Sequence, residues 1–309
     1  MMASIVVFLL LNFFSPAELQ INPSDGSNSA DKTESFEEKL EVAIEHFYQT
    51  RWEKADELFD QLKRESPGDP RPHFFESMMP FWEYFFIHQQ SDLADLFLER
   101  SESAVELSRQ KLESNPDDTT MVLLLSGLHG YRSLVAAGEK KYRVAIQSGI
   151  TGFNYTRQLL SIDSDRPDAQ IGRGMFYYMV GSVPREVRWL TNAAGIRGDI
   201  ETGFYELEKA ASSDNVIRYD AQMMLMYLHE KEENYSEALE YAEKLAERFS
   251  ENVIFHFKCG DLYEMMGNNE MAVKSYQKVI TEDNPSLIEL TELSKKRVDS
   301  LYALGSKNN

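Results

Sequence analysis

Cysteine is nearly absent from the 309-residue chain, which has only Cys259. A single thiol excludes an internal disulfide and any cysteine-based zinc cluster. In its setting, "FHFKCGDLY", we expect this thiol to be buried, because free cysteine packs as a small hydrophobe.

Basic residues are scarce relative to acidic ones. The chain has 32 Lys and Arg residues against 51 Asp and Glu residues, which gives a formal net charge of −19. A nucleic-acid partner requires a basic surface that neutralises phosphates, so we expect none.

Recognisable catalytic motifs are also lacking. The six histidines are scattered and form no HExxH pair, and the chain has no GxSxG elbow, phosphate-binding loop or dinucleotide fingerprint. We therefore expect a protein that is not an enzyme, with no catalytic residues, no metal and no cofactor.

The N-terminal hydrophobic run is too short to span a bilayer. It extends from Ile5 to Phe14, whereas a membrane-spanning helix needs about 20 residues. Small residues follow at Ser15 and Ala17, so we interpret residues 1–17 as a signal peptide cleaved after Ala17, although no Lys or Arg precedes the run. The polar residues 18–33 are expected to be a flexible linker. These features predict export to the bacterial periplasm or outer membrane; retention of an uncleaved N-terminal anchor is the alternative.

From residue 34 onwards the apolar residues recur three and four apart, which is the period of a helix. Ser35 and Glu38 have the spacing of a capping box at the first helix. No segment alternates convincingly for a strand. The sequence predicts an all-α fold.

Two C-terminal segments repeat each other. "NYSEALEYAEKLAERFSEN" and "NNEMAVKSYQKVITEDNP" align with Ala238 and Ala272 one 34-residue period apart. A small residue lets two helices approach, and aromatic residues fill the space beside it. Earlier copies are "WEKADELFDQLKRESPGDP" and "ESAVELSRQKLESNP". The chain resembles the tetratricopeptide-repeat proteins, whose marker positions match Gly260, Tyr263, Ala272 and Tyr276.

This resemblance implies an α-solenoid over residues 34–306. We expect about six antiparallel helix pairs, with clear repeats at 39–71, 221–250 and 255–284, degenerate repeats over 90–215, and an ordered insertion near 181–199. Stacked helix pairs form a superhelix whose concave face usually binds a peptide or a protein.

Residues 74–86, "FFESMMPFWEYFF", contain seven aromatic residues and two methionines. An exposed face of this kind would bind a membrane or a partner. We favour a central helix covered on both sides by neighbouring helix pairs, because a helix that is apolar all round is normally buried. Pro80 either kinks this helix or marks its start.

The insertion lies within "GMFYYMVGSVPREVRWLTNAAGIRGD", residues 174–199. Gly174 and Gly181 are expected to allow close helix contact, Pro184 disfavours helix at Val183, and Asp199 is a candidate cap for the next helix. This segment resembles the inclusion-body-clearance (tetratricopeptide-repeat-39) family. The match runs over Gly174, Tyr177, Tyr178, Pro184, Trp189, Leu190, Gly195, Gly198, Asp199, Gly203, Leu207 and Ala210. The resemblance implies a repeat scaffold and no catalytic activity.

Positive charge gathers in the same region. Residues 140–199 contain nine basic and five acidic residues, a net charge of +4, which leaves −23 for the rest of the chain. Such a basic island attracts an acidic peptide, a lipid headgroup or a carboxylate; alternatively, its arginines pair internally with acidic helices. Arg and Trp are common interface hot spots. The candidate partner-binding residues are Arg173, Tyr177, Arg185, Arg188, Trp189 and Arg197.

Three functional hypotheses follow. The leading one is a non-catalytic scaffold of the cell envelope that binds a protein or peptide along its groove and around the insertion. The second is an enzyme with a pocket between the aromatic helix and the insertion. The third is a peripheral lipid-binding protein, so any membrane association would be peripheral. The oligomeric state stays open.

Overall fold

The computed structural model describes residues 35–162, 167–182, 197–214 and 218–307. Within these ranges the chain is helical and has no strand, so the predicted all-α solenoid is confirmed. The predicted signal peptide and linker, and most of the predicted insertion, lie outside the described residues.

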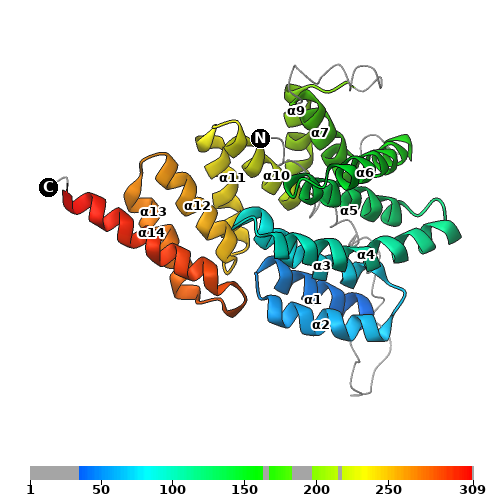
Figure 1. Ribbon diagram of the computed structural model, residues 1–309, viewed down its shortest axis with the longest axis horizontal. Helices are drawn as coiled ribbons and strands as arrows, with labels where there is room; N and C mark the ends of the chain where they lie inside the picture. Colours follow the sequence, from blue (N-terminus) through cyan, green and yellow to red (C-terminus); the bar gives the residue numbers. More distant parts are fainter. Residues whose placement is uncertain (1–34, 163–166, 183–196, 215–217, 308–309) are drawn as a thin grey trace, which may run out of the picture.

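The described helices form six consecutive pairs and a final helix (Figure 1). The pairs are α1 (Phe36–Tyr48) with α2 (Trp52–Glu65), α3 (Pro70–Phe86) with α4 (Ser91–Ser114), α5 (Thr119–Gly138) with α6 (Tyr142–Ile162), α7 (Pro167–Gly181) with α9 (Ile200–Ala211), α10 (Arg218–Lys231) with α11 (Tyr235–Arg248), and α12 (Val253–Met265) with α13 (Asn269–Glu282). A 3-10 turn, η2 (Pro285–Leu287), leads into α14 (Ile288–Lys307), which packs on α13.

The turns inside the pairs share one backbone conformation. Thr50, Lys140, Glu233 and Gly267 each follow the first helix of a pair, and each has a positive φ, between 55° and 75°. A left-handed residue at this position ends a helix and redirects the chain. The capping box at Ser35 and Glu38 is also present, as predicted.

The repeat markers pack as the sequence predicts. Ala238 and Ala272 are fully buried where paired helices meet. A Cβ atom on Gly260 would lie 2.6 Å from the ring of Tyr276, so only glycine leaves room for that ring. The Tyr276 hydroxyl lies 2.8 Å from a carboxylate oxygen of Asp261 and 2.9 Å from one of Glu264, and it donates its proton to one of the two.

The aromatic helix is buried, as favoured from the sequence. In α3, Phe74, Phe75, Phe81 and Trp82 are at most 3% exposed. The helix begins at Pro70, capped by Asp69, and Pro80 lies inside it. The alternative that Pro80 marks the start is therefore wrong. The missing N–H of Pro70 is harmless in the first helical turn, which makes that proline the better start.

The two ends of the helix array meet (Figure 1). Tyr48 at the end of α1 stacks on Phe249 with ring centroids 5.1 Å apart, and Trp82 of α3 contacts Phe255 of α12 at 5.8 Å. These contacts join residues about 170 to 200 positions apart in the sequence. Residues of α1 and α3 therefore pack against α10 and α12.

Candidate partner-binding site

The helices that flank the insertion are in backbone contact. A Cβ atom on Gly203 of α9 would lie 2.7 Å from the backbone nitrogen of Tyr178 in α7, and one on Gly174 would lie 2.8 Å from the Gly203 carbonyl oxygen. Glycine permits this approach because it has no side chain. The predicted role of Gly174 in close helix contact is confirmed.

The segment between α7 and α9 begins and ends at residues that contact each other. A Cβ atom on Gly198 would lie 2.4 Å from the backbone nitrogen of Gly181. The amide of Asp199 donates to the Tyr177 carbonyl oxygen at 3.0 Å. Asp199 also caps α9, as predicted, by accepting from the amide of Thr202 at 2.8 Å. The ends of the segment are therefore fixed against a tightly packed helix pair.

The six candidate residues fall into two groups. Arg185, Arg188 and Trp189 lie outside the described residues. Arg197, at the returning end, is exposed, and Tyr177 is half-buried with its ring against Phe176. Arg173 forms an ion pair with Glu206 of α9 at 2.5 Å, with both side chains largely buried. The contact role of all six stays a prediction.

The positive charge of the basic island, residues 140–199, is partly neutralised by ion pairs within the chain. Lys141 pairs with Asp95 of α4, and Arg173 with Glu206. The guanidinium of Arg157 lies over the ring of Phe153 at 5.9 Å. Lys140, Arg143 and Arg197 are exposed. The island thus contains both internally paired cations and cations directed towards solvent.

Groups with strongly shifted pKa values are found on several different helices within the described residues. Burial raises the pKa of Asp220 in α10 to about 8, lowers that of His129 in α5 to about 4, and raises that of Cys259 in α12 to about 12. An active site usually concentrates such groups in one cavity. The described residues also include no group of three or more His, Cys, Asp or Glu side chains placed to hold a metal ion.

None of the described helices combines the length and the apolar character needed to cross a bilayer. Six of the seven aromatic residues of α3 are buried, and Phe85 is partly buried.

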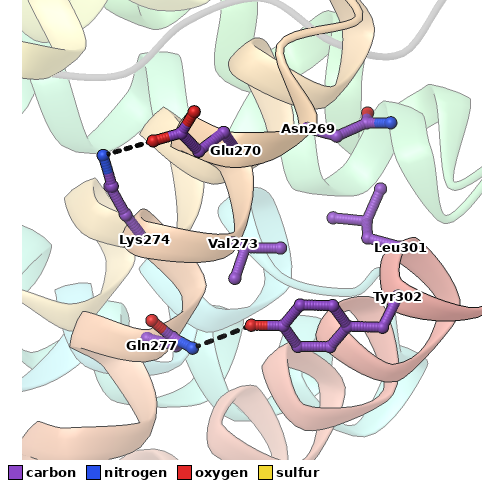
Figure 2. A pocket seen from close by; sticks show the side chains of 7 residues that line it. All are labelled: Asn269, Glu270, Val273, Lys274, Gln277, Leu301 and Tyr302. Carbon is purple, nitrogen blue, oxygen red and sulfur yellow. Dashed lines mark hydrogen bonds and ion pairs between the residues drawn. The ribbon is translucent and has the colours of Figure 1, made fainter. Parts of the chain in front are cut away.

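One surface cleft lies far along the chain from the insertion, between α13 and α14 (Figure 2). It has a volume of about 380 Å³ and is lined by Val273 and Leu301, with Tyr302 receiving a hydrogen bond from Gln277 at 3.4 Å. The charged residues at its edge, Glu270 and Lys274, pair with each other at 2.8 Å. The cleft contains none of the candidate residues and no activated polar group.

Residues 168–293 match the family Iml2/Tetratricopeptide repeat protein 39. The resemblance seen from Gly174 to Ala210 is thus confirmed, and the match continues through α13 into α14. No curated protein matches the sequence. Among solved structures, the chain is similar to the crystal structure of a tetratricopeptide repeat protein from Parabacteroides merdae ATCC 43184, with 17% identity, a TM-score of 0.35, and coverage of 88% of this chain and 92% of that chain.

The packing of α1 and α3 against α10 and α12 is the feature that the sequence did not predict. Its signal is a run of six buried residues in α10, from Met223 to Leu228, which exceeds the single buried stripe of a helix packed on one side. Phe85 of α3 supplies the extra cover, with its ring centroid 4.7 Å from that of Tyr227. The repeat fold suggests a protein-interaction scaffold, and in it α3 packs against α10 and α12.

Proposed function

We propose that the protein is a non-catalytic interaction scaffold of the cell envelope that binds an acidic protein or peptide at the insertion between α7 and α9. The observation that carries this proposal is the meeting of Gly181 and Gly198, which fixes both ends of the insertion on a rigid helix pair. Long loops whose ends lie close together are frequently functional. Arg185, Arg188 and Trp189 supply residue types that dominate interface energies.

Charge supports the choice of an acidic partner. Arg197 is exposed at the returning end of the segment, and Lys140 and Arg143 are exposed at the start of α6. In a chain of net charge −19, such a local basic surface attracts acidic ligands. The envelope location rests on the N-terminal sequence pattern alone.

The test is an affinity capture with in-cell crosslinking from envelope extract. The wild type is compared with the double variant Arg185→Glu, Arg188→Glu, and with a control that reverses Lys295 and Lys296, two exposed cations on α14. We expect one captured protein to be lost with the insertion variant and retained with the control. Equal capture by all three proteins would contradict the proposal.

A further inference from the structure

Helix α6 differs from the rest of this acidic chain, because its 21 residues include no Asp or Glu. The chain as a whole has 51 acidic residues in 309. Among the α-helices within the described residues only α5 shares this property, and α5 is largely buried. Helix α6 presents one side to solvent. It therefore exposes a surface that carries no negative charge of its own.

The exposed side of α6 carries a straight stripe of side chains. The α6 stripe consists of five exposed residues that follow one another at steps of four and three positions: Arg143, Gln147, Ile150, Asn154 and Arg157. Such steps keep side chains on one side of a helix. Ile150, which is 58% exposed, lies at the centre of the stripe with an arginine at each end. At 1.5 Å per residue, the two arginines are about 21 Å apart along the helix axis.

The stripe faces away from the inner row of helices. First helices of neighbouring pairs contact each other, as α5 does with α7, and so form that row. On the side of α6 opposite the stripe, a Cβ atom on Gly152 would lie 3.1 Å from the Gly130 backbone nitrogen of α5. On the same side, the hydroxyl of Thr156 lies 2.7 Å from that of Ser126 in α5. A ligand on the stripe therefore binds outside the concave face of the array.

Both arginines of the stripe retain donors for a ligand. Within the described part of the chain, neither Arg143 nor Arg157 forms an ion pair. The Arg157 guanidinium lies 5.9 Å from the ring centroid of Phe153, which stacks on Phe176 of α7 at 4.2 Å. A guanidinium over an aromatic ring keeps its charge and its N–H groups, so it can still bind a carboxylate.

Charge and apolar area together favour one class of ligand. A partner helix is about 10 Å wide and lies within about one Debye length, 8 Å, of the stripe, so the local cations dominate its attraction. An anionic membrane is much wider and also faces the acidic remainder of the chain. In addition, Val144 and Ile150 are the exposed aliphatic side chains of α6, and two such side chains are too few to insert into a bilayer.

We propose that the α6 stripe binds an acidic helix of a partner protein, with carboxylates on Arg143 and Arg157 and an apolar side chain on Ile150 between them. The spacing requires acidic residues about 14 positions apart on one face of the partner helix, because both helices rise equally per residue. Arginine pairs with carboxylates at two points, which also orients the partner. This inference rests on the proposed function, for which it names a second contact surface and the form of the acidic segment.

The test uses a labelled, alanine-rich helical peptide with two glutamates on one face, about 14 positions apart, and leucines between them. We expect fluorescence anisotropy to show binding to the full chain that weakens as salt is added. The stripe variants, Arg143→Glu with Arg157→Glu and, separately, Ile150→Asp, are each expected to bind at least tenfold more weakly. Replacing the two glutamates of the peptide by glutamine is expected to have the same effect.

The matched control is Lys295→Glu with Lys296→Glu, which makes the same charge change on the exposed side of α14. We expect it to bind the peptide like the wild type. All variants are compared by circular dichroism, because Arg157 also contacts Phe153. If the double stripe variant loses helicity, Arg143→Glu alone takes its place, since its side chain is exposed at the other end of the stripe.

The insertion variant Arg185→Glu, Arg188→Glu separates this proposal from the proposed function, and we expect it to bind the peptide like the wild type. Equal envelope capture by that variant would reject the insertion as a contact site and leave the stripe standing. No binding of the peptide by the wild type, or equal binding by the stripe variants, would overturn the stripe. Flotation of the wild type with phosphatidylglycerol vesicles, or its dimerisation, would also overturn the proposal if the stripe variants abolish it.

Discussion

The pair α7–α9 and the contact between the two ends of the array hold helices together by opposite means. In α7–α9, glycines remove side chains so that backbones touch, as at Gly174 and Gly203. Between the ends, large side chains such as Tyr48 and Trp82 bridge helices whose backbones stay apart, and buried polar groups join them. The first contact should therefore be sensitive to added volume, and the second to charge and pH.

The largest effect is expected from volume added to the backbone contact. In Gly203→Ala the new methyl group meets backbone atoms of Tyr178, which cannot move aside without separating the helices. We expect the free energy of unfolding to fall by roughly 3 kcal/mol, measured by urea unfolding.

Gly68→Ala is the control for this change, because a Cβ atom there would meet nothing within 4 Å. We expect the control to be neutral or slightly stabilising, since alanine restricts the unfolded chain. Equal losses for the two variants would show that backbone contact is not the cause.

The contact between the ends should respond to pH through Asp220. Its carboxyl is fully buried beside the Tyr48 hydroxyl, and burial raises its pKa to about 8. The unfolded chain loses this proton near pH 4, so the folded protein holds an extra proton between about pH 4 and pH 8, and the free energy of unfolding falls as the pH rises through that range. The hydroxyl of Tyr48 in α1 acts on the carboxyl of Asp220, and Tyr131 of α5 acts in turn on Tyr48.

Asp220→Asn keeps the neutral form at every pH. Between pH 6 and pH 8 we expect the wild type to lose about 2 kcal/mol more of its free energy of unfolding than this variant, measured by urea unfolding at both pH values. Parallel losses in the two proteins would exclude Asp220 as the source of the pH dependence.

A third glycine separates the effect of a backbone neighbour from that of a side-chain neighbour. Gly260 faces the ring of Tyr276 rather than a backbone, so its neighbour can be trimmed. We expect Gly260→Ala to cost about 1.5 kcal/mol of the free energy of unfolding and the added change Tyr276→Leu to recover part of it. No such trimming can rescue Gly203→Ala. A Gly260→Ala loss that Tyr276→Leu only deepens would contradict this distinction.

The smallest effect is expected at the ion pair of α7–α9. Arg173→Met removes the partner of the largely buried Glu206 while keeping much of the side-chain volume. We expect a loss of about 1 kcal/mol in the free energy of unfolding, measured by urea unfolding, with partner capture measured in parallel. Loss of capture with unchanged stability would instead assign Arg173 to the contact site.

The sequence predicts the local packing well because each repeat carries its own small residue and aromatic filler. Ala238, Ala272 and Gly260 with Tyr276 all occupy the positions inferred from the 34-residue period. The capping box at Ser35 and the cap at Asp199 are equally local, since each involves residues three positions apart.

The contact between the ends could not be predicted in the same way. Tyr48 and Asp220 are 172 positions apart, and neither differs in pattern from residues that pack within their own repeat. Helical periodicity reports which face of a helix is apolar, and does not report which distant helix covers it. The buried run of α10 does not identify the covering helix either, because α5 has a buried run at least as long.

The most direct test of the closed array is a crosslink between its ends in the wild-type monomer. Lys54 of α2 and Lys278 of α13 are both exposed and both lie near Glu251, although they are far apart in sequence. With a short amine-reactive reagent, we expect a link between Lys54 and Lys278 as abundant as the link between Lys274 and Lys278 within α13. Formation of the α13 link without the Lys54–Lys278 link would show that the array is open.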